Sequence, residues 1–323
     1  MKILVTGSSG FLGSNLIKKF RKDGHFTIGY DISNPRFSSC IPDNSFRANI
    51  LDEVALETVL NCCQPDVIFH LAAFATIQDG LSDSYTTYSV NVNGTRALLN
   101  AVNRVKSPAT VIYASTDKVY GSICSGKKYT ENLPLNPNTN SVYDVSKAAA
   151  DLLVQEWIKA GGNGIIVRFC NLYGPYDLHS SRIVPASIIA VLENRPPVLK
   201  RYRPAREEPL CDFYRDMLYV DDLCEGLASL VAGRAELDTH IFNFGASECV
   251  SMSDVIRDIC KTASFSDEPI IREADSSIEL ARQSMDYSQA NRAFGFVPRT
   301  GLDEGIKLTY KWWIDYMKEG YFS

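Results

Sequence analysis

A glycine-rich turn between an apolar run and a helical pattern constrains the fold most. The segment VTGSSGFLGSNL, residues 5–16, follows the apolar run KILVTG and places three glycines at the turn. Glycine permits a tight turn and a close backbone approach to a pyrophosphate, and the helix N-terminus behind it offers free N–H groups. This context is typical of a dinucleotide-binding βαβ unit. The residues predicted to bind the dinucleotide at this turn are Gly7, Gly10, Phe11, Leu12 and Gly13.

Further apolar runs alternate with helical patterns through the first half of the chain. Near-continuous apolar runs are typical of parallel strands that are covered by helices on both faces. Between them, Leu12, Leu16 and Phe20 fall on one helical face. The sequence therefore predicts an α/β fold, a Rossmann-type doubly wound parallel sheet with a smaller C-terminal lobe. The predicted strands lie at 2–7, 26–31, 66–73, 110–116 and 164–174.

The composition and patterning of the sequence change near residue 175, where prolines become frequent and the strand–helix alternation weakens. We predict a dinucleotide-binding domain over 1–174 and a lobe over 175–323 that mainly binds substrate. The run IFNFGAS at 241–247 still resembles a sheet strand, so we expect the chain to return to the first domain near 212–262.

Composition narrows the class of protein. The formal net charge of −5 argues against a nucleic-acid-binding surface, which needs clustered basic residues. No apolar run approaches the roughly 20 residues of a membrane helix, and the N-terminus has no signal-peptide pattern. The nine cysteines include no metal-binding spacing, so we interpret them as reduced core thiols and predict a cytoplasmic protein with no metal site. His70 is expected to pack beside the cofactor, with a catalytic role less favoured.

The end of the second predicted strand indicates which dinucleotide is bound. A carboxylate at Asp31 can accept hydrogen bonds from the adenosine ribose and would repel a 2′-phosphate, which favours NAD over NADP. Arg36 lies close enough to keep NADP as the less favoured alternative. Asn49 and Ile50 could lie beside the adenine, although a structural turn would also explain them. The remaining predicted cofactor contacts are Leu71, Ala72 and Ala73.

Tyr143 and Lys147 are four residues apart at the start of a predicted helix. This spacing places both side chains on one helical face. A phenol has a pKa of about 10 and is a poor base. A neighbouring ammonium and a positively charged nicotinamide ring would both lower that pKa. The two residues are candidates for proton transfer and cofactor binding, and an exposed helical pair is the alternative.

Seven motifs together resemble one family. In order along the chain stand TGSSGFLG, HLAA, NVNGT, ASTDKVYG, YDVSK, RFCNLYGP and RDMLYVDD. Over roughly residues 1–300 the chain resembles the extended short-chain dehydrogenases/reductases, which include nucleotide-sugar epimerases and dehydratases. The resemblance implies bound NAD(P), a nucleoside-diphosphate sugar as partner, a homodimer formed through helices near 85–105 and 143–160, and a Ser/Thr–Tyr–Lys catalytic set. By position this set is Thr116, Tyr143 and Lys147, with Ser115 as an adjacent substrate contact.

Asp117 and Lys118 bear on which reaction follows. Epimerases of the family carry small or neutral residues there, whereas sugar 4,6-dehydratases carry Asp–Glu or, in some branches, Asp–Lys. The resemblance thus implies that Asp117 is an acid and Lys118 a base of lowered pKa. The alternative is a turn-capping Asp117 and a solvent-facing Lys118. We predict an NAD-dependent enzyme, an NDP-hexose 4,6-dehydratase that acts through a 4-keto sugar. An epimerase at C2 or C4, a keto-sugar reductase or a non-catalytic NAD-bound protein remain alternatives.

The resemblance also implies substrate contacts. Asn171 is expected near the sugar or its diphosphate, and the forked guanidinium of Arg215 suits the diphosphate. Arg282 is a third candidate, from the C-terminal lobe. The nucleotide base stays open, and the Asp–Lys pair before Val–Tyr resembles enzymes that act on CDP-linked sugars.

Overall fold

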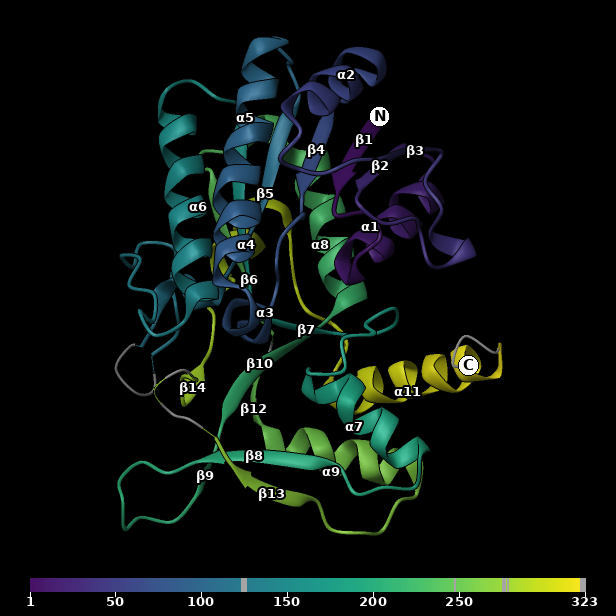
Figure 1. Cartoon of the computed structure of the whole chain (residues 1–323), viewed down its shortest axis with the longest axis vertical. Helices are drawn as coiled ribbons and strands as arrows, with labels where there is room; N and C mark the ends of the chain where they lie inside the picture. The colour runs from purple at the N-terminus through teal and green to yellow at the C-terminus, as the bar shows by residue number, and fades with distance from the viewer. Residues whose placement is uncertain (123–126, 247, 275–276, 278, 320–323) are drawn as a thin grey trace.

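A seven-stranded parallel sheet with helices on both faces forms the larger part of the molecule (Figure 1). The computed structural model describes residues 1–122, 127–246, 248–274, 277 and 279–319, without the side chains of residues 78 and 79. The strand order is β11-β6-β5-β4-β1-β2-β3, and it confirms the predicted Rossmann-type sheet. The strands are β1 (Lys2–Thr6), β2 (Phe26–Asp31), β3 (Asn44–Arg47), β4 (Val67–His70), β5 (Thr110–Thr116), β6 (Gly164–Phe169) and β11 (Ile241–Phe244).

Each face of the large sheet buries its own hydrophobic core. Strands β4 and β6 are buried along their whole length, which explains their continuous apolar sequence. On one face pack α1 (Phe11–Lys22), α8 (Val220–Gly233) and α10 (Ser288–Phe294). On the other face pack α2 (Glu53–Cys63), α5 (Thr95–Arg104) and α6 (Val142–Lys159). Short elements connect them: α3 (Ile77–Ser82), α4 (Ser84–Tyr88), η1 (Ser38–Cys40), the π-helical η2 (Ser89–Gly94), η3 (Asp117–Tyr120) and η4 (Arg234–Glu236).

The smaller lobe lies at the carboxyl edge of the large sheet (Figure 1). One of its sheets contains β7 (Asn171–Tyr173), β10 (Tyr214–Tyr219), β12 (Cys249–Ser251) and β14 (Arg282–Gln283). The other contains β8 (Val198–Tyr202), β9 (Cys211–Asp212) and β13 (Ile270–Glu273). Its helices are α7 (Ile183–Leu192), α9 (Met252–Ala263) and α11 (Leu302–Lys318). They share a hydrophobic core that contains the fully buried Trp313 of α11.

The chain crosses between the two parts of the molecule more than once. The run 164–174, expected to be one strand, is divided at Cys170: β6 ends in the large sheet, and β7 pairs with β10 in the smaller lobe. After β10 the chain returns to the large part with α8 and β11. The predicted boundary between a dinucleotide-binding domain ending at residue 174 and a lobe starting at residue 175 stays a prediction.

Two details differ from the sequence-based expectations. Strand β3 was not predicted, because its four residues are half-buried or exposed at the sheet edge and carry no apolar pattern. The described cysteines are free, but only Cys40, Cys63, Cys170 and Cys224 among them are buried. Cys62 is exposed, Cys211, Cys249 and Cys260 are half-buried, and Cys124 lies outside the described residues. None of the helices in the described part of the chain is long and apolar enough to cross a membrane.

Candidate active site

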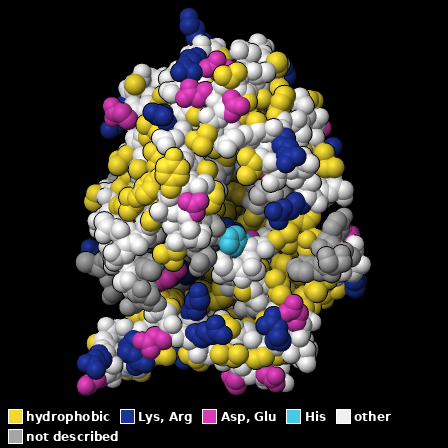
Figure 2. All heavy atoms as spheres, viewed as in Figure 1, with side chains coloured by type: hydrophobic (Ala, Val, Ile, Leu, Met, Phe, Trp, Pro, Cys, Tyr) yellow, Lys and Arg dark blue, Asp and Glu magenta, His cyan; other side chains and the backbone are white. Residues whose placement is uncertain are grey.

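A cavity of about 1450 Å³ opens at the carboxyl ends of the large sheet and extends to the smaller lobe. Figure 2 shows the surface hollowed near the centre of this face, with Lys and Arg side chains gathered on the lobe below. A continuous lining joins the glycine turn to Arg215 and Glu279. The predicted site residues that line it are Gly7, Gly10, Phe11, Leu12, Gly13, Asp31, Asn49, Ile50, Leu71, Ala72, Ala73, Ser115, Thr116, Asp117, Lys118, Tyr143, Lys147, Asn171 and Arg215.

The glycine turn forms a backbone cradle. Gly7 has a φ of 73°, and a Cβ there would lie 2.8 Å from the backbone nitrogen of Ala72. A Cβ on Gly13 would overlap the carbonyl oxygen of Gly7. Among the described residues no side chain caps α1 at Gly10, so its first N–H groups stay available at the positive end of the helix dipole. These features fit a pyrophosphate at this turn.

Asp31 ends β2 beside this cradle. One carboxylate oxygen accepts a hydrogen bond from the Ser9 N–H at 3.0 Å, and the other accepts from the Ser33 N–H at 2.8 Å. The carboxylate is thus held at the cavity wall where a ribose of the dinucleotide would lie. Asn49 lines the cavity but also accepts from the Leu51 N–H at 3.0 Å, as in the structural turn considered for it.

His70 is a buried link between elements. Its Nδ1 lies 2.8 Å from the Thr6 hydroxyl, and its Nε2 lies 3.0 Å from the Thr95 hydroxyl. Burial, followed by the charge of Lys147, lowers the pKa of His70 to about 3. The imidazole is therefore neutral and links β4 to β1 and α5.

The N-terminal turns of α6 present Tyr143 and Lys147. The Lys147 ammonium donates to the carbonyl of Ala114 at 2.6 Å and lies 4.4 Å from the ring centre of Tyr113. Burial lowers the pKa of Lys147 to about 7, although Asp151 opposes that shift. Thr116 lies close enough to Tyr143 for its side chain to lower the pKa of the phenol. That the two act with Lys147 as a catalytic set stays a prediction.

The pKa of Tyr143 differs from the expectation. Burial is the largest influence and raises the pKa of the phenol, whereas the hydrogen bond with Thr116 lowers it. The charges that bear on the phenol are those of Asp144 and Asp117, which raise its pKa, and of Arg182, which lowers it; the lowering expected from Lys147 is not among them. A bound nicotinamide cation would have to supply the remaining stabilisation of a phenolate.

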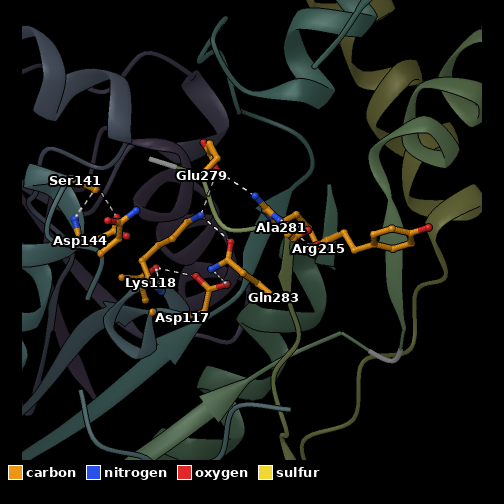
Figure 3. Close-up of polar contacts among 12 residues, drawn as sticks. Asp117, Lys118, Ser141, Asp144, Arg215, Glu279, Ala281 and Gln283 are labelled. Carbon is orange, nitrogen blue, oxygen red and sulfur yellow. Dashed lines mark hydrogen bonds and ion pairs between the residues drawn. The ribbon is translucent and has the colours of Figure 1, made fainter. Parts of the chain in front are cut away.

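Asp117 and Lys118 are buried together in the short helix η3 that follows β5 (Figure 3). Asp117 is 3% exposed and Lys118 8%, which excludes the solvent-facing alternative for Lys118. The N-cap of this turn is Thr116, whose hydroxyl accepts from the Lys118 N–H at 3.3 Å and donates to Asp117 at 3.1 Å. Burial raises the pKa of Asp117, while the charges of Lys118 and Arg215 oppose the rise.

Two residues of the smaller lobe complete this cluster. Gln283 donates its Nε2–H to Asp117 at 3.0 Å and accepts from the Lys118 ammonium at 2.7 Å. Glu279 lies 3.6 Å from the Lys118 ammonium and 3.0 Å from the guanidinium of Arg215. Figure 3 shows these side chains converging from both parts of the molecule. Glu279 and Gln283 were not among the predicted site residues.

Ser115 lines the cavity, but its hydroxyl is used within the protein. Its hydroxyl donates to Asp151 at 2.6 Å, and Asp151 forms a buried ion pair with Arg168 at 2.9 Å. The Ser115 hydroxyl is therefore committed to this network, and Thr116 is the neighbour that reaches Tyr143.

The three predicted substrate contacts that follow Tyr143 and Lys147 in the sequence do not all reach the cavity. Asn171 and Arg215 line the cavity, and the side-chain nitrogen of Asn171 is buried with no hydrogen-bond partner among the described residues. A ligand oxygen would satisfy it. Arg282 is exposed, stacks 5.2 Å from the ring centre of Tyr214 and is not part of the cavity wall as described.

Arg182 is a further cavity residue that sequence reasoning missed. It precedes α7, pairs with Asp177 at 3.3 Å and lies 5.7 Å from the ring centre of Phe11. Its charge also lowers the pKa of Tyr143. The segment around it matches none of the motifs that carried the resemblance, so the sequence offered no signal for it.

Comparison with known proteins agrees with this geometry. The model of the NAD dependent epimerase/dehydratase family matches residues 3–245, and the chain belongs to this family. A dTDP-glucose 4,6-dehydratase of Actinoplanes sp. is 31% identical, with 97% of this chain and 98% of the relative aligned. The dTDP-glucose 4,6-dehydratase 1 of Escherichia coli is 29% identical, with 100% and 97% aligned.

Solved structures show the same fold. The dTDP-glucose 4,6-dehydratase of Streptomyces venezuelae, solved with NAD bound, superposes with a TM-score of 0.86 at 26% identity over 99% of this chain and 98% of that one. The UDP-glucose 4-epimerase of Thermus thermophilus, also solved with NAD, gives a TM-score of 0.85 at 26% identity over 97% and 99%. The predicted class, an NAD-dependent nucleotide-sugar epimerase or dehydratase, is confirmed.

Proposed function

We propose that this protein is an NAD-dependent NDP-hexose 4,6-dehydratase. The observation that carries the proposal is the buried Asp117–Lys118 pair, which lines the cavity together with Thr116 and Tyr143. A reaction that only moves a hydride at C4 needs no second acid and base. A buried ionisable pair of opposite charge at a cavity wall is a candidate for general acid–base chemistry.

The first step would be oxidation of the sugar at C4. NAD, when bound along the glycine turn, would supply the acceptor for the C4 hydride and later return that hydride to C6. Tyr143 would take the proton of the C4 hydroxyl, while Thr116 orients that hydroxyl through its own hydrogen bond. Lys147 would hold the nicotinamide ribose and contribute positive charge beside the phenolate.

The second step would eliminate water across C5 and C6. The new C4 ketone acidifies the C5 proton, because the electron pair of the broken C–H bond delocalises into the carbonyl. Neutral Lys118 would take the C5 proton, and protonated Asp117 would give its proton to the C6 hydroxyl. A C5–C6 double bond forms, the C6–O bond breaks and water leaves. When the hydride reaches C6, the Lys118 ammonium would return a proton to C5, and Asp117 would take a proton from solvent. The raised pKa of Asp117 suits its role as the acid.

The substrate assignment rests on the smaller lobe and the relatives. Arg215 would bind the diphosphate, and the unpartnered amide nitrogen of Asn171 would donate to the sugar or the diphosphate. The names of the relatives make dTDP-glucose the first substrate to test. A CDP-hexose is the second, on the resemblance of the Asp–Lys pair.

A homodimer in the cytoplasm is part of the proposal. The α4 and α6 segments expose Tyr85 at 82% and Leu152 at 54%, which supports pairing of these helices with a second copy. Leu81 of α3 and Tyr88 of α4 are also exposed.

The test is incubation of the NAD-loaded protein with dTDP-, UDP-, GDP- and CDP-hexoses, followed by mass spectrometry. A product lighter by one water supports the dehydratase. A product of unchanged mass would favour the epimerase, and retained NAD without any turnover would favour the binding protein.

A lysine variant identifies the base. Lys118→Met should still oxidise the sugar, seen as absorbance of reduced nicotinamide, but should lose about 10²- to 10⁴-fold in water release. Lys307→Met is the matched control, because Lys307 forms an exposed pair with Asp303 in α11. Water release by Lys118→Met at the wild-type rate would remove Lys118 from the mechanism.

A further inference from the structure

Gln283 occupies an unusual place for a neutral side chain. It is 1% exposed and lies on the two-residue strand β14, whose partner β10 places Arg215 in register with it. Its amide reaches across to the large sheet and contacts both members of the buried pair, Asp117 at 3.0 Å and Lys118 at 2.7 Å (Figure 3). One amide thus holds two ionisable side chains that are adjacent in sequence.

The polarity of the amide fixes how each partner is held. An amide donates only from its nitrogen and accepts only at its oxygen, while an ammonium group can only donate. In the structure the oxygen of Gln283 faces Lys118 and its nitrogen faces Asp117. Both bonds can form with neutral Lys118 and protonated Asp117, and both are strongest with the ammonium and the carboxylate.

We propose that Gln283 is a positioning residue that promotes elimination by stabilising the charged forms of Asp117 and Lys118 as they appear. This inference rests on the proposed dehydratase function. Elimination starts with protonated Asp117 and neutral Lys118 and ends with a carboxylate and an ammonium. As Lys118 gains a proton and Asp117 loses one, both hydrogen bonds of Gln283 become charge-assisted. They are therefore stronger in the transition state than before elimination begins. Since neither bond involves Tyr143 or Thr116, oxidation at C4 gains nothing from them.

Glu279 does not replace this role. Its carboxylate pairs with the charge of Lys118 at 3.6 Å, and its closer partner is Arg215 at 3.0 Å. It can also offer no donor to ionised Asp117. The donor to Asp117 from the smaller lobe is Gln283, while Thr116 supplies another from the same turn.

The test compares the two steps in three variants of the NAD-loaded protein. Gln283→Met keeps the length of the side chain and removes both bonds, and Gln283→Glu keeps only the acceptor for Lys118. Gln289→Met is the control, because Gln289 donates to the carbonyl of Ile241 in the large sheet. The probe is dTDP-glucose, or the member of the hexose panel that the wild type dehydrates. Oxidation is followed by reduced nicotinamide in a single turnover, and elimination by exchange of the C5 hydrogen in D₂O and by water release.

We expect Gln283→Met to slow elimination by about 10- to 100-fold, the effect of losing hydrogen bonds to charged groups, with oxidation unchanged. Gln283→Glu should also slow elimination, because it places a carboxylate beside Asp117. Gln289→Met should match the wild type in both steps. Equal loss in both steps, or wild-type elimination by Gln283→Met, would overturn the inference.

A second measurement needs no substrate and separates this inference from the proposed function. Acetic anhydride should acetylate Lys118 several-fold faster in Gln283→Met than in the wild type or Gln289→Met, because the amide no longer holds the amine. Peptide mass spectrometry reads the site. If the wild type dehydrates no hexose of the panel, the proposed function fails while this result still supports positioning of Lys118. Unchanged acetylation of Lys118 counts against the positioning itself.

Discussion

The two halves of the cavity are built in different ways. The dinucleotide half consists mainly of backbone: the glycine turn, the start of α1 and the ends of β1 and β4. The acid–base half consists of charged and polar side chains, and its central cluster joins Asp117 and Lys118 of the large sheet to Glu279 and Gln283 of the smaller lobe.

This difference indicates which half of the cavity can change by substitution and which half cannot. The backbone of the glycine turn has almost no room for added side-chain atoms, so substitutions there would disturb the fold itself. A side-chain cluster can change its chemistry by single substitutions without disturbing the sheet. A dehydratase of Streptomyces venezuelae and an epimerase of Thermus thermophilus superpose equally well on this chain, so the fold alone does not distinguish the two reactions.

The largest expected effect tests whether the halves can be separated. Tyr143→Phe removes the hydroxyl that takes the C4 proton and leaves the glycine turn intact. We expect oxidation of the sugar to fall by about 10²- to 10⁴-fold, while NAD stays bound. Single-turnover absorbance measures the first quantity, and NAD released on denaturation measures the second. Loss of NAD from this variant would show that the two halves are not independent.

The next effect tests the cradle. Gly13→Ala places a methyl group against the Gly7 carbonyl oxygen, and overpacking of this kind costs about 1–3 kcal/mol. We expect weaker NAD binding and a lower melting temperature, measured by titration and thermal unfolding. Gly301→Ala is the control, because a Cβ there has no described atom within 4 Å. Wild-type NAD affinity in Gly13→Ala would contradict the cradle.

The smallest expected effect is on the pH dependence of stability, and it comes from Lys147. The pKa of Lys147 falls from 10.5 to about 7 on burial, so between these values the unfolded chain binds more protons than the folded one. The free energy of unfolding of the cofactor-free protein should therefore rise with pH above about 7, by about 1.4 kcal/mol per unit from this group alone. Lys147→Met should lack this part of the slope. Melting temperatures of both proteins between pH 7 and 9 give the difference, and identical slopes would contradict a neutral buried amine.

The sequence predicted the cofactor half well because its signals are local. The glycine spacing, Asp31 at a strand end and the Tyr143–Lys147 spacing each involve one or two neighbouring elements. Strand β3 escaped prediction because an exposed edge strand needs no apolar pattern.

The acid–base half was only partly predictable, because its contacts join residues far apart in the sequence. Arg282 was chosen for its charge, yet its neighbour Gln283 reaches the site. Successive residues of a strand point to opposite faces, so a shift of one position exchanges cavity for surface. The register of β14 follows from its pairing with β10, which a two-residue strand does not reveal in the sequence.

The short link at Cys170 has a consequence for the molecule as a whole. Only this buried residue separates β6 in the large sheet from β7 in the smaller one, and its N–H bonds to the Phe244 carbonyl at 3.1 Å. The two lobes thus share a continuous hydrogen-bonded backbone where they meet. In a calorimeter we expect them to melt as one cooperative transition, and cutting the chain at residue 174 would leave neither fragment able to fold by itself.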